Sequence, residues 1–339
     1  MSQNENAGNK SYRILANRKS LSSKQSWIDL RRNYIGGSDA AAVIGISRFR
    51  SPLSVYLEKK SLIKKEPPNE RMFWGIRIEP LLRDRFKELT GYEVRELKYV
   101  LQSVESPFAI ANLDGIVNLG PAEDNQWAVL ELKCVNEFTG NSDDFRGGAA
   151  GYISPEYYAQ IQHYLYVTGL KIAFLGMLIG GNHFVYNRIT RDDEAISNMI
   201  KLEKHWYEQY FLTNTLPPAG QSDGDLLGKF YDRPERKEVQ LPESAAVLVD
   251  DYLSATQEIK KWEDRKKLAQ IKLEEMMGNS GDTAVVGLRR ISWKPVETKR
   301  FSASKAKEMN LLTEDQIAQC SLVTASRRFS ITEIKRKDK

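Results

Sequence analysis

The sequence predicts a mixed α/β protein, an α+β arrangement in which a central mixed β-sheet is flanked by helices, with a helical and hairpin extension at the C-terminal end. Three observations support this prediction. Strand-like apolar runs cluster between residues 93 and 188, and segments with apolar residues every three or four positions lie on both sides of them. A stretch rich in Pro, Gly and Asp then separates a last, highly charged helix from the rest.

Length and composition favour two domains with a packed core. The chain has 339 residues, of which 41% are hydrophobic and 10% aromatic, and this is enough apolar material for a sizeable core. We expect a flexible segment at residues 1–24, a first domain at 25–215, a linker at 216–238 and an extension with a long helix and a basic tail at 239–339.

Several classes of protein are disfavoured by composition. No apolar run reaches the roughly 20 residues that a membrane-spanning helix needs, and the polar N-terminus lacks the apolar stretch of a signal peptide. Two cysteines and three scattered histidines give neither a disulfide framework nor a zinc cluster. We therefore expect a protein of a reducing cytoplasm without a membrane partner.

Charge is distributed unevenly along the chain. Residues 1–65 carry thirteen Lys or Arg against four acidic residues, and the last thirteen residues carry six against two. Because the net charge of the whole chain is +5, the middle is acidic. Basic ends around an acidic middle suit a polyanion groove that leads to a cation-binding centre. An ordinary soluble surface is the alternative.

The helices are predicted from capping signals and apolar periodicity. Ser38 or Asp39 is expected to cap a small-residue helix over 40–45, Pro155 suits a first helical turn, and Gly91 suits a helix end. The remaining helices are expected at 27–32, 52–60, 70–90, 155–168, 192–212 and 242–277.

The strands are predicted from short apolar runs bounded by turn residues. Gly120-Pro121 with Asp124-Asn125, and later Gly180-Gly181, mark two hairpin turns. The expected strands are 93–102, 108–112 with its continuation to Ile116, 127–135, 171–179, 183–188 and a last hairpin within 285–296. A glycine-rich segment at 138–152 is expected to form a loop over the site.

Glu79 is unusual within the predicted helix 70–90. It falls on the stripe expected to be the apolar face of that helix, made of Met72, Ile76, Leu82, Phe86 and Leu89. A carboxylate on such a face needs an arginine partner or a metal ion. Pro80, which follows it, is expected to kink the helix or to break it.

The strand around Glu131 carries the candidate chemistry. Because side chains alternate along a strand, Glu131 and Lys133 share one face while Leu130 and Leu132 point into a core. Asp114 lies on the neighbouring strand of the predicted hairpin. Two carboxylates and an ammonium can hold a divalent metal and position a water beside it. A solvated Glu-Lys strand face is the alternative.

A second candidate site lies near the N-terminus. Gly36-Gly37-Ser38 precedes a helix start, where free N–H groups and the helix dipole favour a phosphate, and Arg31 lies close enough in sequence to clamp the same anion. The alternative is a capped helix with surface arginines. Gln160, on one face of the helix 155–168, could orient a water or reach a phosphate, or it could close the edge of the core.

These segments agree in order and spacing with a known family. Over roughly residues 25–185 the chain resembles the lambda-exonuclease-like, YqaJ-type viral recombination nucleases of the PD-(D/E)xK superfamily. The matching motifs are Trp27-x-x-Leu30-Arg31 with Ile35-Gly36-Gly37-Ser38, Trp74-Gly75-x-x-x-Glu79, Leu113-Asp114-Gly115, Leu130-Glu131-Leu132-Lys133-Cys134, Asp144-Phe145 before Gly147-Gly148, and Tyr158-Ala159-Gln160-Ile161-Gln162. Asp114 lacks the preceding Pro of the superfamily's name, a departure that removes no ligand.

The resemblance implies a restriction-endonuclease-like core with a metal site. Asp114 and Glu131 are the expected Mg²⁺ ligands, with the carbonyl of Leu132 as a possible third and Mn²⁺ as an expected substitute. Lys133 matches the residue that orients or activates the attacking water, either as a base or as a charge stabiliser. Glu79 matches a helix carboxylate near a second metal.

The remaining motif residues are assigned in the same way. Gln160 matches the glutamine that supports the catalytic lysine and the nucleophile. Arg31 and Ser38 match the pair that grips the 5′-phosphate of the digested strand, which gives the cleavage a direction.

The resemblance also implies an activity and partners. We expect a Mg²⁺-dependent 5′-to-3′ exonuclease of a phage or prophage, cytoplasmic in a bacterial host, that digests one strand of linear duplex DNA. It would leave a 3′ single strand for a single-strand annealing recombinase and act as a homo-oligomer, a trimeric ring. A structure-specific or nicking endonuclease is the alternative, followed by a non-catalytic DNA-binding assembly protein.

The extension beyond residue 238 leaves two interpretations open. Its long helix carries Val249, Tyr252, Ile259, Trp262 and Leu273 along one side, a stripe that could pair with another helix or pack on the first domain. Basic pairs such as Arg289-Arg290 could instead follow a nucleic-acid backbone.

Overall fold

A five-stranded mixed sheet in the order β3-β6-β7-β8-β9 supports the candidate site. Strands β7 and β8 run parallel, and every other neighbouring pair is antiparallel. The strands are β3 (Glu93–Arg95), β6 (Gly115–Asn118), β7 (Trp127–Val135), β8 (Ile172–Ile179) and β9 (His183–Thr190). The prediction of a mixed sheet within an α/β fold is confirmed.

The computed structural model describes residues 11–18, 24–63, 70–124, 126–136, 153–231, 238–298, 300–321 and 329–331. The glycine-rich segment 138–152 and most of the basic tail lie outside the described residues. The chain divides into two units, Met1–Tyr231 and Asp232–Lys339.

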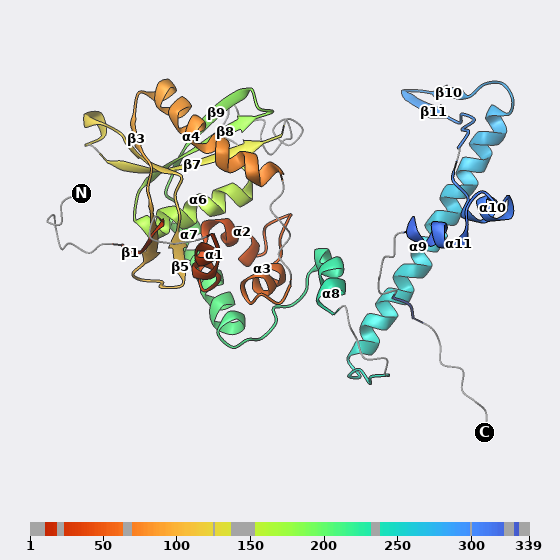
Figure 1. Cartoon of the computed structure of the whole chain (residues 1–339), viewed down its shortest axis with the longest axis horizontal. Helices are drawn as coiled ribbons and strands as arrows, with labels where there is room; N and C mark the ends of the chain where they lie inside the picture. Colours follow the sequence, from red (N-terminus) through yellow and green to blue (C-terminus); the bar gives the residue numbers. More distant parts are fainter. Residues whose placement is uncertain are drawn as a thin grey trace. The chain divides into compact units, whose positions relative to one another are not determined.

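Helices cover both faces of this sheet, α4 (Glu70–Thr90) on one side and α6 (Pro155–Thr168) on the other (Figure 1). Helix α6 is the crossover that parallel neighbours such as β7 and β8 require. It begins and ends where the sequence predicts. Ser154 caps its first turn, and Gly169, at φ +71°, adopts the left-handed conformation that ends it.

The alternation along β7 directs its side chains to two different cores. Leu130 and Leu132 pack with Leu82 and Phe86 on the α4 side, whereas Val129 joins the cluster on the α6 side. Because successive side chains of a strand point to opposite faces, Glu131 and Lys133 face α6. The prediction that Leu130 and Leu132 point into a core while Glu131 and Lys133 share the other face of the strand is confirmed.

A second, four-stranded sheet has the order β1-β4-β5-β2. Its strands are β1 (Tyr12–Asn17), β4 (Tyr99–Ser103), β5 (Ala109–Ala111) and β2 (Ile35–Gly36). The strand predicted at 93–102 was therefore wrong as a single element, because β3 and β4 belong to different sheets. The run from 108 to 116 divides in the same way into β5 and β6. Residues 12–17, expected to be flexible, pair with β4.

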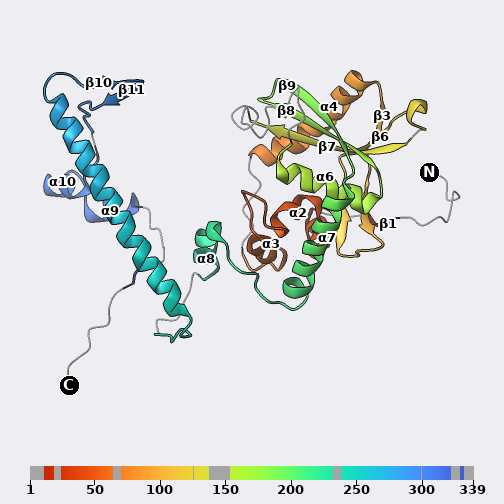
Figure 2. The same ribbon diagram turned by 180° about the vertical axis from the view of Figure 1, so that it is seen from behind.

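Helices α2 (Gly37–Val43) and α7 (Asp193–Trp206) lie beside α6 and pack against it through Ala40, Ala41, Ala159 and Met199 (Figure 2). Helix α7 continues as a π-helical turn over Tyr207–Phe211. The other helices of the first unit are α1 (Lys24–Arg32), α3 (Pro52–Lys59) and α8 (Gly224–Phe230).

The apolar face expected for α4 was wrong in part. Leu82 and Phe86 are buried as predicted, but three other members of that face are exposed: Met72, Ile76 and Leu89. Ile78 packs beside Leu82 instead, because residues at four-residue spacing follow one stripe of a helix. The helix continues through Pro80, so the alternative of a break was wrong.

Two further helix predictions need correction. The cap of α2 is Gly36 rather than Ser38 or Asp39, and Asp39, inside the first turn, accepts a hydrogen bond from the Gly36 N–H at 3.3 Å. This return contact from the third helical residue is half of a capping box. In α7, the spacing of Leu202 between Met199 and Trp206 predicts an inward side chain, but Leu202 is exposed.

The second unit consists of a long helix and small elements. They are α9 (Ala245–Met277), the hairpin of β10 (Thr283–Val286) and β11 (Arg289–Ser292), α10 (Ala303–Glu308) and α11 (Glu314–Gln319). The predicted helical and hairpin extension is present. Within the stretch predicted as a linker, α8 is helical and Asp223 accepts a 2.6 Å hydrogen bond from the Ser51 hydroxyl. The predicted domain boundaries stay a prediction. In the described part of the chain, every helix is too short or too polar to cross a membrane.

A buried ion pair joins α6 to α7. His163 Nδ1 lies 2.9 Å from Glu203 Oε1, and its Nε2 lies 3.1 Å from the carbonyl oxygen of Ile110. Two acceptors at the ring favour the imidazolium, which donates from both nitrogens. Burial by itself lowers the pKa of His163, but the Glu203 carboxylate outweighs burial, and the net pKa is raised above the ordinary value.

We expect this pair to stabilise the fold fully below about pH 6.5, the ordinary histidine pKa. The contribution should be lost as the pH rises through the raised pKa of folded His163. Urea unfolding of the wild type and of Glu203→Gln measures this contribution. Below about pH 6.5, the free energy of unfolding of the wild type should be higher by about 1–3 kcal/mol. The difference should shrink as the pH rises above about 6.5 and through the raised pKa of folded His163, and a pH-independent difference would contradict the charged pair.

Gly37 is predicted to tolerate no side chain. A Cβ built there lies 2.4 Å from the ring of Tyr164, which is buried and has no room to move away. Gly37→Ala should therefore lower the free energy of unfolding by about 1–3 kcal/mol, as overpacking does. Gly36→Ala is the matched control, since its nearest neighbour would be an Arg31 nitrogen at 3.5 Å, an ordinary contact. Equal effects in thermal or urea unfolding would refute the prediction.

Candidate active site

Three of the predicted residues form one hydrogen-bonded group around Glu131. The Glu131 carboxylate is buried, and its Oε1 accepts hydrogen bonds from the Lys133 ammonium and, at 2.6 Å, from the Gln160 side-chain amide. Lys133 comes from the same face of β7, and Gln160 projects from the facing helix α6. The strand alternation and the helix together thus bring an acid, a cation and an amide to one point.

Among the described residues, the second oxygen of Glu131, Oε2, is buried and has no hydrogen-bond partner. Burial, and after it the neighbouring charge of Asp114, raise the pKa of Glu131 to about 8. A cation bound beside this carboxyl group would favour its charged form.

Asp114 lies directly before β6, where the strand register sets it opposite Glu131. Gly115 pairs with Leu130 in the antiparallel ladder. Asp114, the residue before Gly115, therefore faces Glu131, the residue after Leu130. The Oδ2 of Asp114 accepts a 2.8 Å hydrogen bond from the Leu132 N–H. This contact orients the carboxylate along the end of β7, and the Leu132 side chain points to the opposite core.

Lys133 is held between a carboxylate and an aromatic ring. Its Nζ pairs with Glu131 and lies 5.3 Å from the centre of the Tyr157 ring. Burial lowers the pKa of Lys133, but the charges of Glu131 and then Asp114 outweigh it and raise the pKa above the ordinary value.

Glu79 is paired with an arginine, the first of the two outcomes that its position on α4 left open. Its Oε1 accepts a 2.6 Å hydrogen bond from Arg83, one helical turn later. Arg83 also donates from Nε to the carbonyl oxygen of Asp114 at 3.1 Å. Burial and the charge of Asp114 raise the pKa of Glu79. Arg83 therefore connects Glu79 to the Asp114 loop, a role that the i, i+4 spacing of the two residues could have suggested.

The oxygen atoms of this site are of the chemical type that binds a hard divalent cation. Carboxylate and carbonyl oxygens are the ligands such ions prefer, and the orphaned Oε2 of Glu131 beside Asp114 offers an open oxygen. Among the described residues, however, no three Asp, Glu, His or Cys side chains gather closely enough to enclose an ion. The side chains of Asp114 and Glu131, together with a backbone carbonyl such as that of Leu132, are the ligands that fit a divalent cation here.

Arg31 and Ser38 are brought together as the sequence predicts. Nη2 of Arg31 donates to the Ser38 hydroxyl at 2.8 Å, and its guanidinium lies 5.5 Å from the centre of the Trp27 ring. Ser38 is exposed in the first turn of α2, where backbone N–H groups of the helix are free to bind an anion.

A buried acid beneath this pair was not anticipated. Asp39 accepts hydrogen bonds from Lys59 at 2.8 Å and from Arg50 at 3.0 Å. Burial tends to raise the pKa of Asp39, but the charges of Lys59, Arg50 and Arg31 together bring it well below the ordinary value. The three cations come from separate segments, so no local sequence signal could have revealed the cluster.

Tyr164 connects the two groups of residues. Its hydroxyl accepts a 3.0 Å hydrogen bond from Gln160, while its ring lies against Gly37. Burial, and then the charges of Glu131 and Asp114, raise its pKa well above the ordinary tyrosine value. No chemical role was predicted for Tyr164 from the sequence. Its position one helical turn after Gln160 nevertheless places both side chains on the same face of α6.

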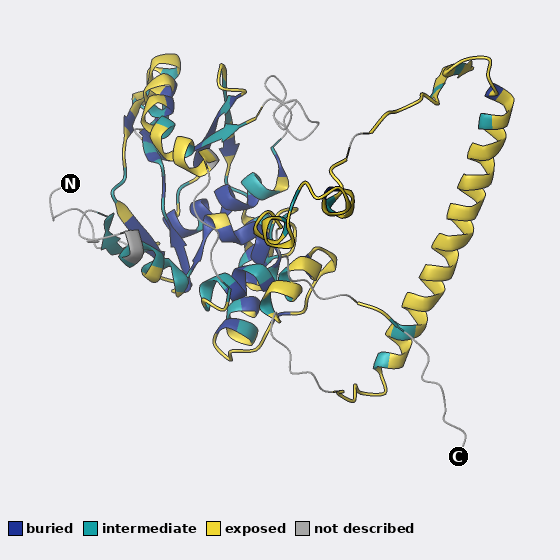
Figure 3. Cartoon of the chain, turned by 45° about the vertical axis from the view of Figure 1, so that its right-hand side comes forward, coloured by how far each residue is buried: buried dark blue, intermediate teal, exposed yellow. Residues whose placement is uncertain are grey.

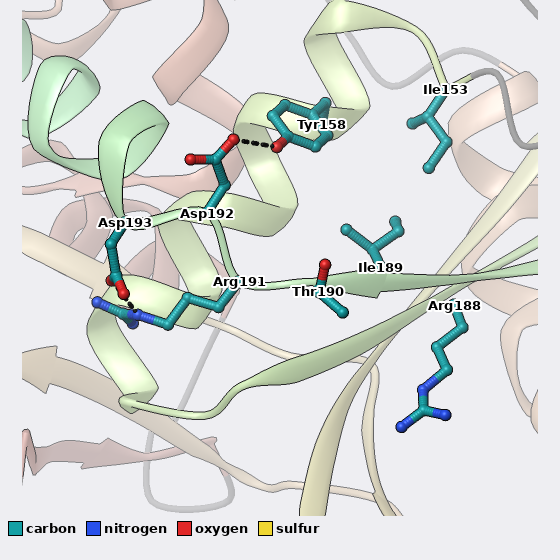
Figure 4. A pocket seen from close by; sticks show the side chains of 8 residues that line it. All are labelled: Ile153, Tyr158, Arg188, Ile189, Thr190, Arg191, Asp192 and Asp193. Atoms are coloured by element: carbon teal, nitrogen blue, oxygen red, sulfur yellow. Dashed lines mark hydrogen bonds and ion pairs between the residues drawn. The ribbon is translucent and has the colours of Figure 1, made fainter.

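A separate hollow lies at the turn from β9 into α7 (Figure 4). The Tyr158 hydroxyl donates to Asp192 at 2.9 Å, and Arg191 pairs with Asp193 at 2.6 Å. These contacts fix the turn, and none of the predicted site residues lines the hollow.

Comparison with known proteins gives a family match for the first unit. The family described as the YqaJ-like viral recombinase domain matches residues 26–171. A protein of Bacillus subtilis (strain 168), named Uncharacterized protein YqaJ, is 27% identical over 327 residues, which cover 95% of this chain and 98% of that protein. Protein D345L of African swine fever virus is 34% identical over 59 residues, 17% of each chain.

Solved structures give weaker matches. An alkaline exonuclease from Laribacter hongkongensis, LHK-Exo, is 20% identical, and its complex with dAMP is 21% identical. Each match covers 56% of this chain and 94% of the other, with a TM-score of 0.46.

The matched residues contain all of the candidate residues described above, from Arg31 to Gln160. Residues 26–171 thus match the YqaJ-like viral recombinase domain, which confirms the resemblance expected from the ordered motifs.

Proposed function

We propose that the chain is a metal-dependent deoxyribonuclease that digests one strand of linear duplex DNA from its 5′ end. The observation that carries the proposal is the buried Glu131, bonded to Lys133 and Gln160 and open at Oε2 beside Asp114. Phosphodiester hydrolysis needs a site of this kind, in which negative charge, a cation and a water are held together.

Asp114 and Glu131 would hold the metal, with the Leu132 carbonyl as a further donor. A bound Mg²⁺ supplies Lewis-acid stabilisation of charge on the phosphate, and Mn²⁺ is an expected substitute. The Leu132 N–H fixes the orientation of Asp114, and Gln160 fixes Glu131, so that the two carboxylates are preorganised.

Lys133 brings a cation to the same point. Its ammonium is positioned by Glu131 and by the Tyr157 ring, and it has three donors with which to orient a water or a phosphate oxygen. Glu79 acts at the edge of the site through Arg83, which holds the Asp114 loop. We therefore assign Glu79 to the support of Asp114 or to a second metal.

Direction would come from the Arg31–Ser38 pair. A terminal 5′-phosphate at the first turn of α2 would meet the guanidinium, the serine hydroxyl and free backbone N–H groups. Because Tyr164 contacts both Gly37 and Gln160, this anion site is fixed relative to Glu131. The remaining expectations follow from the family: a 3′ single strand passed to an annealing recombinase, a trimeric ring, and a phage or prophage protein in a bacterial cytoplasm.

Glu131→Gln should abolish the activity while the chain still folds. The amide removes the negative charge needed for the metal, and since loss of a supporting contact around a metal already lowers activity ten- to a hundredfold, we expect a loss of at least about a hundredfold. The amide oxygen can still accept the hydrogen bonds of Gln160 and Lys133, but the melting temperature should fall because the buried Lys133 ammonium loses its charged partner. Degradation of linear duplex DNA with Mg²⁺ or with EDTA measures the activity.

The matched control is Glu123→Gln, which removes a carboxylate that pairs with Arg188. It should leave the activity unchanged. Covalently closed circular DNA, tested alongside, separates the exonuclease from an endonuclease with the same residues. Cleavage of the circle would favour the endonuclease, and undiminished activity of Glu131→Gln would refute the site.

Arg31→Ala should remove the preference for a 5′-phosphate. One charge-assisted hydrogen bond contributes about 1.5–3 kcal/mol, so the wild type should digest 5′-phosphorylated duplexes about ten- to a hundredfold faster than 5′-hydroxyl duplexes. The variant should digest both at the slower rate. Initial rates on the two substrates measure the effect.

Arg32→Ala is the control for this experiment. The neighbouring arginine pairs with Asp29 on the surface at 2.7 Å, so its removal changes the same charge without touching Ser38. A preference that survives Arg31→Ala, or that Arg32→Ala removes equally, would rule out the proposed clamp.

A further inference from the structure

Helix α9 is exposed along most of its length (Figure 3), and its exposed residues include a long stripe of apolar side chains. It spans 33 residues, and exposed fractions reach 70% at Leu248, 61% at Trp262 and 80% at Met276. Proteins rarely expose an apolar patch of this length unless it binds a partner. A helix of this kind is stabilised mainly by packing of its apolar face.

The stripe follows a heptad repeat. From Ala245 to Met276, alternating steps of three and four residues pass through ten positions, nine of which are apolar. The a positions are Ala245, Tyr252, Ile259, Lys266 and Leu273, and the d positions are Leu248, Ala255, Trp262, Ala269 and Met276. Such a pattern over more than four heptads is typical of a coiled coil.

The sizes of these side chains fit an antiparallel partner of the same sequence. In an antiparallel pair each a residue faces a d residue, and one symmetric register places large residues opposite small or complementary ones. The layers are Ala245 with Met276, Leu248 with Leu273, Tyr252 with Ala269, Ala255 with Lys266, and Ile259 with Trp262. Alternation of large and small residues across facing positions is what a packed core requires.

Charges beside the stripe favour the same register. The g positions are Asp251, Glu258, Arg265 and Lys272, two acids followed by two bases. In the antiparallel register Asp251 meets Lys272 of the second copy, and Glu258 meets Arg265. The pairing is complementary at all four positions of each helix.

A parallel pair would be unfavourable by contrast. It would set Lys266 against Lys266 in one core layer, and Glu258 against Glu263 at the g and e positions. Like charges at such positions repel. The sequence of α9 therefore discriminates between the two orientations.

The described contacts of α9 leave room for this partner. Phe329 touches Tyr252 edge to face at 5.2 Å between ring centres, yet 45% of Tyr252 stays exposed. Glu258 pairs with Lys261 on the same helix at 2.7 Å, a surface contact that is weak enough to exchange. Four other exposed apolar side chains lie off the stripe and would not be covered: Val247, Leu253, Leu268 and Ile271.

We propose that α9 binds α9 of a second copy of this chain as an antiparallel two-stranded coiled coil, centred between Ile259 and Trp262. The pairing concerns the second unit alone and does not depend on the nuclease activity. It assigns the extension to self-assembly and leaves any nucleic-acid contact to other residues.

Disulfide trapping in the full-length chain tests the orientation. In a Cys134→Ser, Cys320→Ser background, which removes both cysteines of the chain, Ala255→Cys and Lys266→Cys proteins carrying different tags are oxidised alone and after mixing. The antiparallel pair brings these two positions together, so only the mixture should form a cross-linked dimer. Cross-linking of Ala255→Cys with itself would show a parallel pair, and no cross-linking in any sample would refute the proposal, as expected if α9 packed within its own chain.

Charge reversal tests the register. Glu258→Arg should raise the concentration for half-maximal cross-linking about tenfold, because two attractive pairs become repulsive. Glu258→Arg combined with Arg265→Glu should restore the original value. A parallel pair predicts the opposite sign for Glu258→Arg, which would then face Glu263. Asp264→Arg, the same charge change at an outward f position, is the control and should have no effect; an equal effect there would overturn the register.

Discussion

The burial of the Glu131 carboxylate is the constraint on which the first unit depends. A charged group away from water is unfavourable unless it is paired and hydrogen-bonded, and this one is surrounded by groups that serve that need: Lys133 from its own strand and Gln160 from α6. Both hydrogen bonds reach Oε1, and Oε2 has no hydrogen-bond partner among the described residues. The same burial that makes the site unstable as an isolated anion gives it affinity for a cation, which is the property the proposed chemistry uses.

Helix α6 connects the separate parts of the site. As the crossover between β7 and β8 it must lie across one sheet face, and this places Gln160 over Glu131. One turn later Tyr164 fills the space against Gly37, and His163, on another side of the helix, is tied to Glu203 of α7. A single element therefore fixes the distance between the proposed metal site and the proposed phosphate site, which a directional nuclease requires.

The second unit follows a different physical rule. Its long helix buries few of its apolar side chains within the described chain. The order of residues along one stripe of this helix is the basis for the proposed pairing. The sizes and charges along that stripe fit the proposed antiparallel copy, so that the extension would join chains while the proposed cleavage would belong to the first unit. The two proposals rest on separate residues and can fail separately.

Local patterns in the sequence were sufficient for features that neighbouring residues control. The alternation of Glu131 and Lys133 with two leucines, and the first and last residues of α6, depend on residues within a few positions, and both were predicted correctly. The association of Asp114 with the Glu131 strand required only a hairpin. The pattern was less informative for α4, where the stripe through Ile78 and Leu82 could be recognised only from its packing against the sheet.

Tertiary structure alone decided the contacts between distant segments. The pairing of β1 with β4, the division of residues 93–102 between two sheets, and the cations around Asp39 all join segments that no local periodicity relates. Tyr164 gained its role because Gly37 leaves space for its ring. The sequence by itself thus determined which residue types share the strand face at Glu131, since residue type and strand alternation are local properties. The fold decided which partners surround them, because burial and pairing depend on segments brought together only when the chain packs.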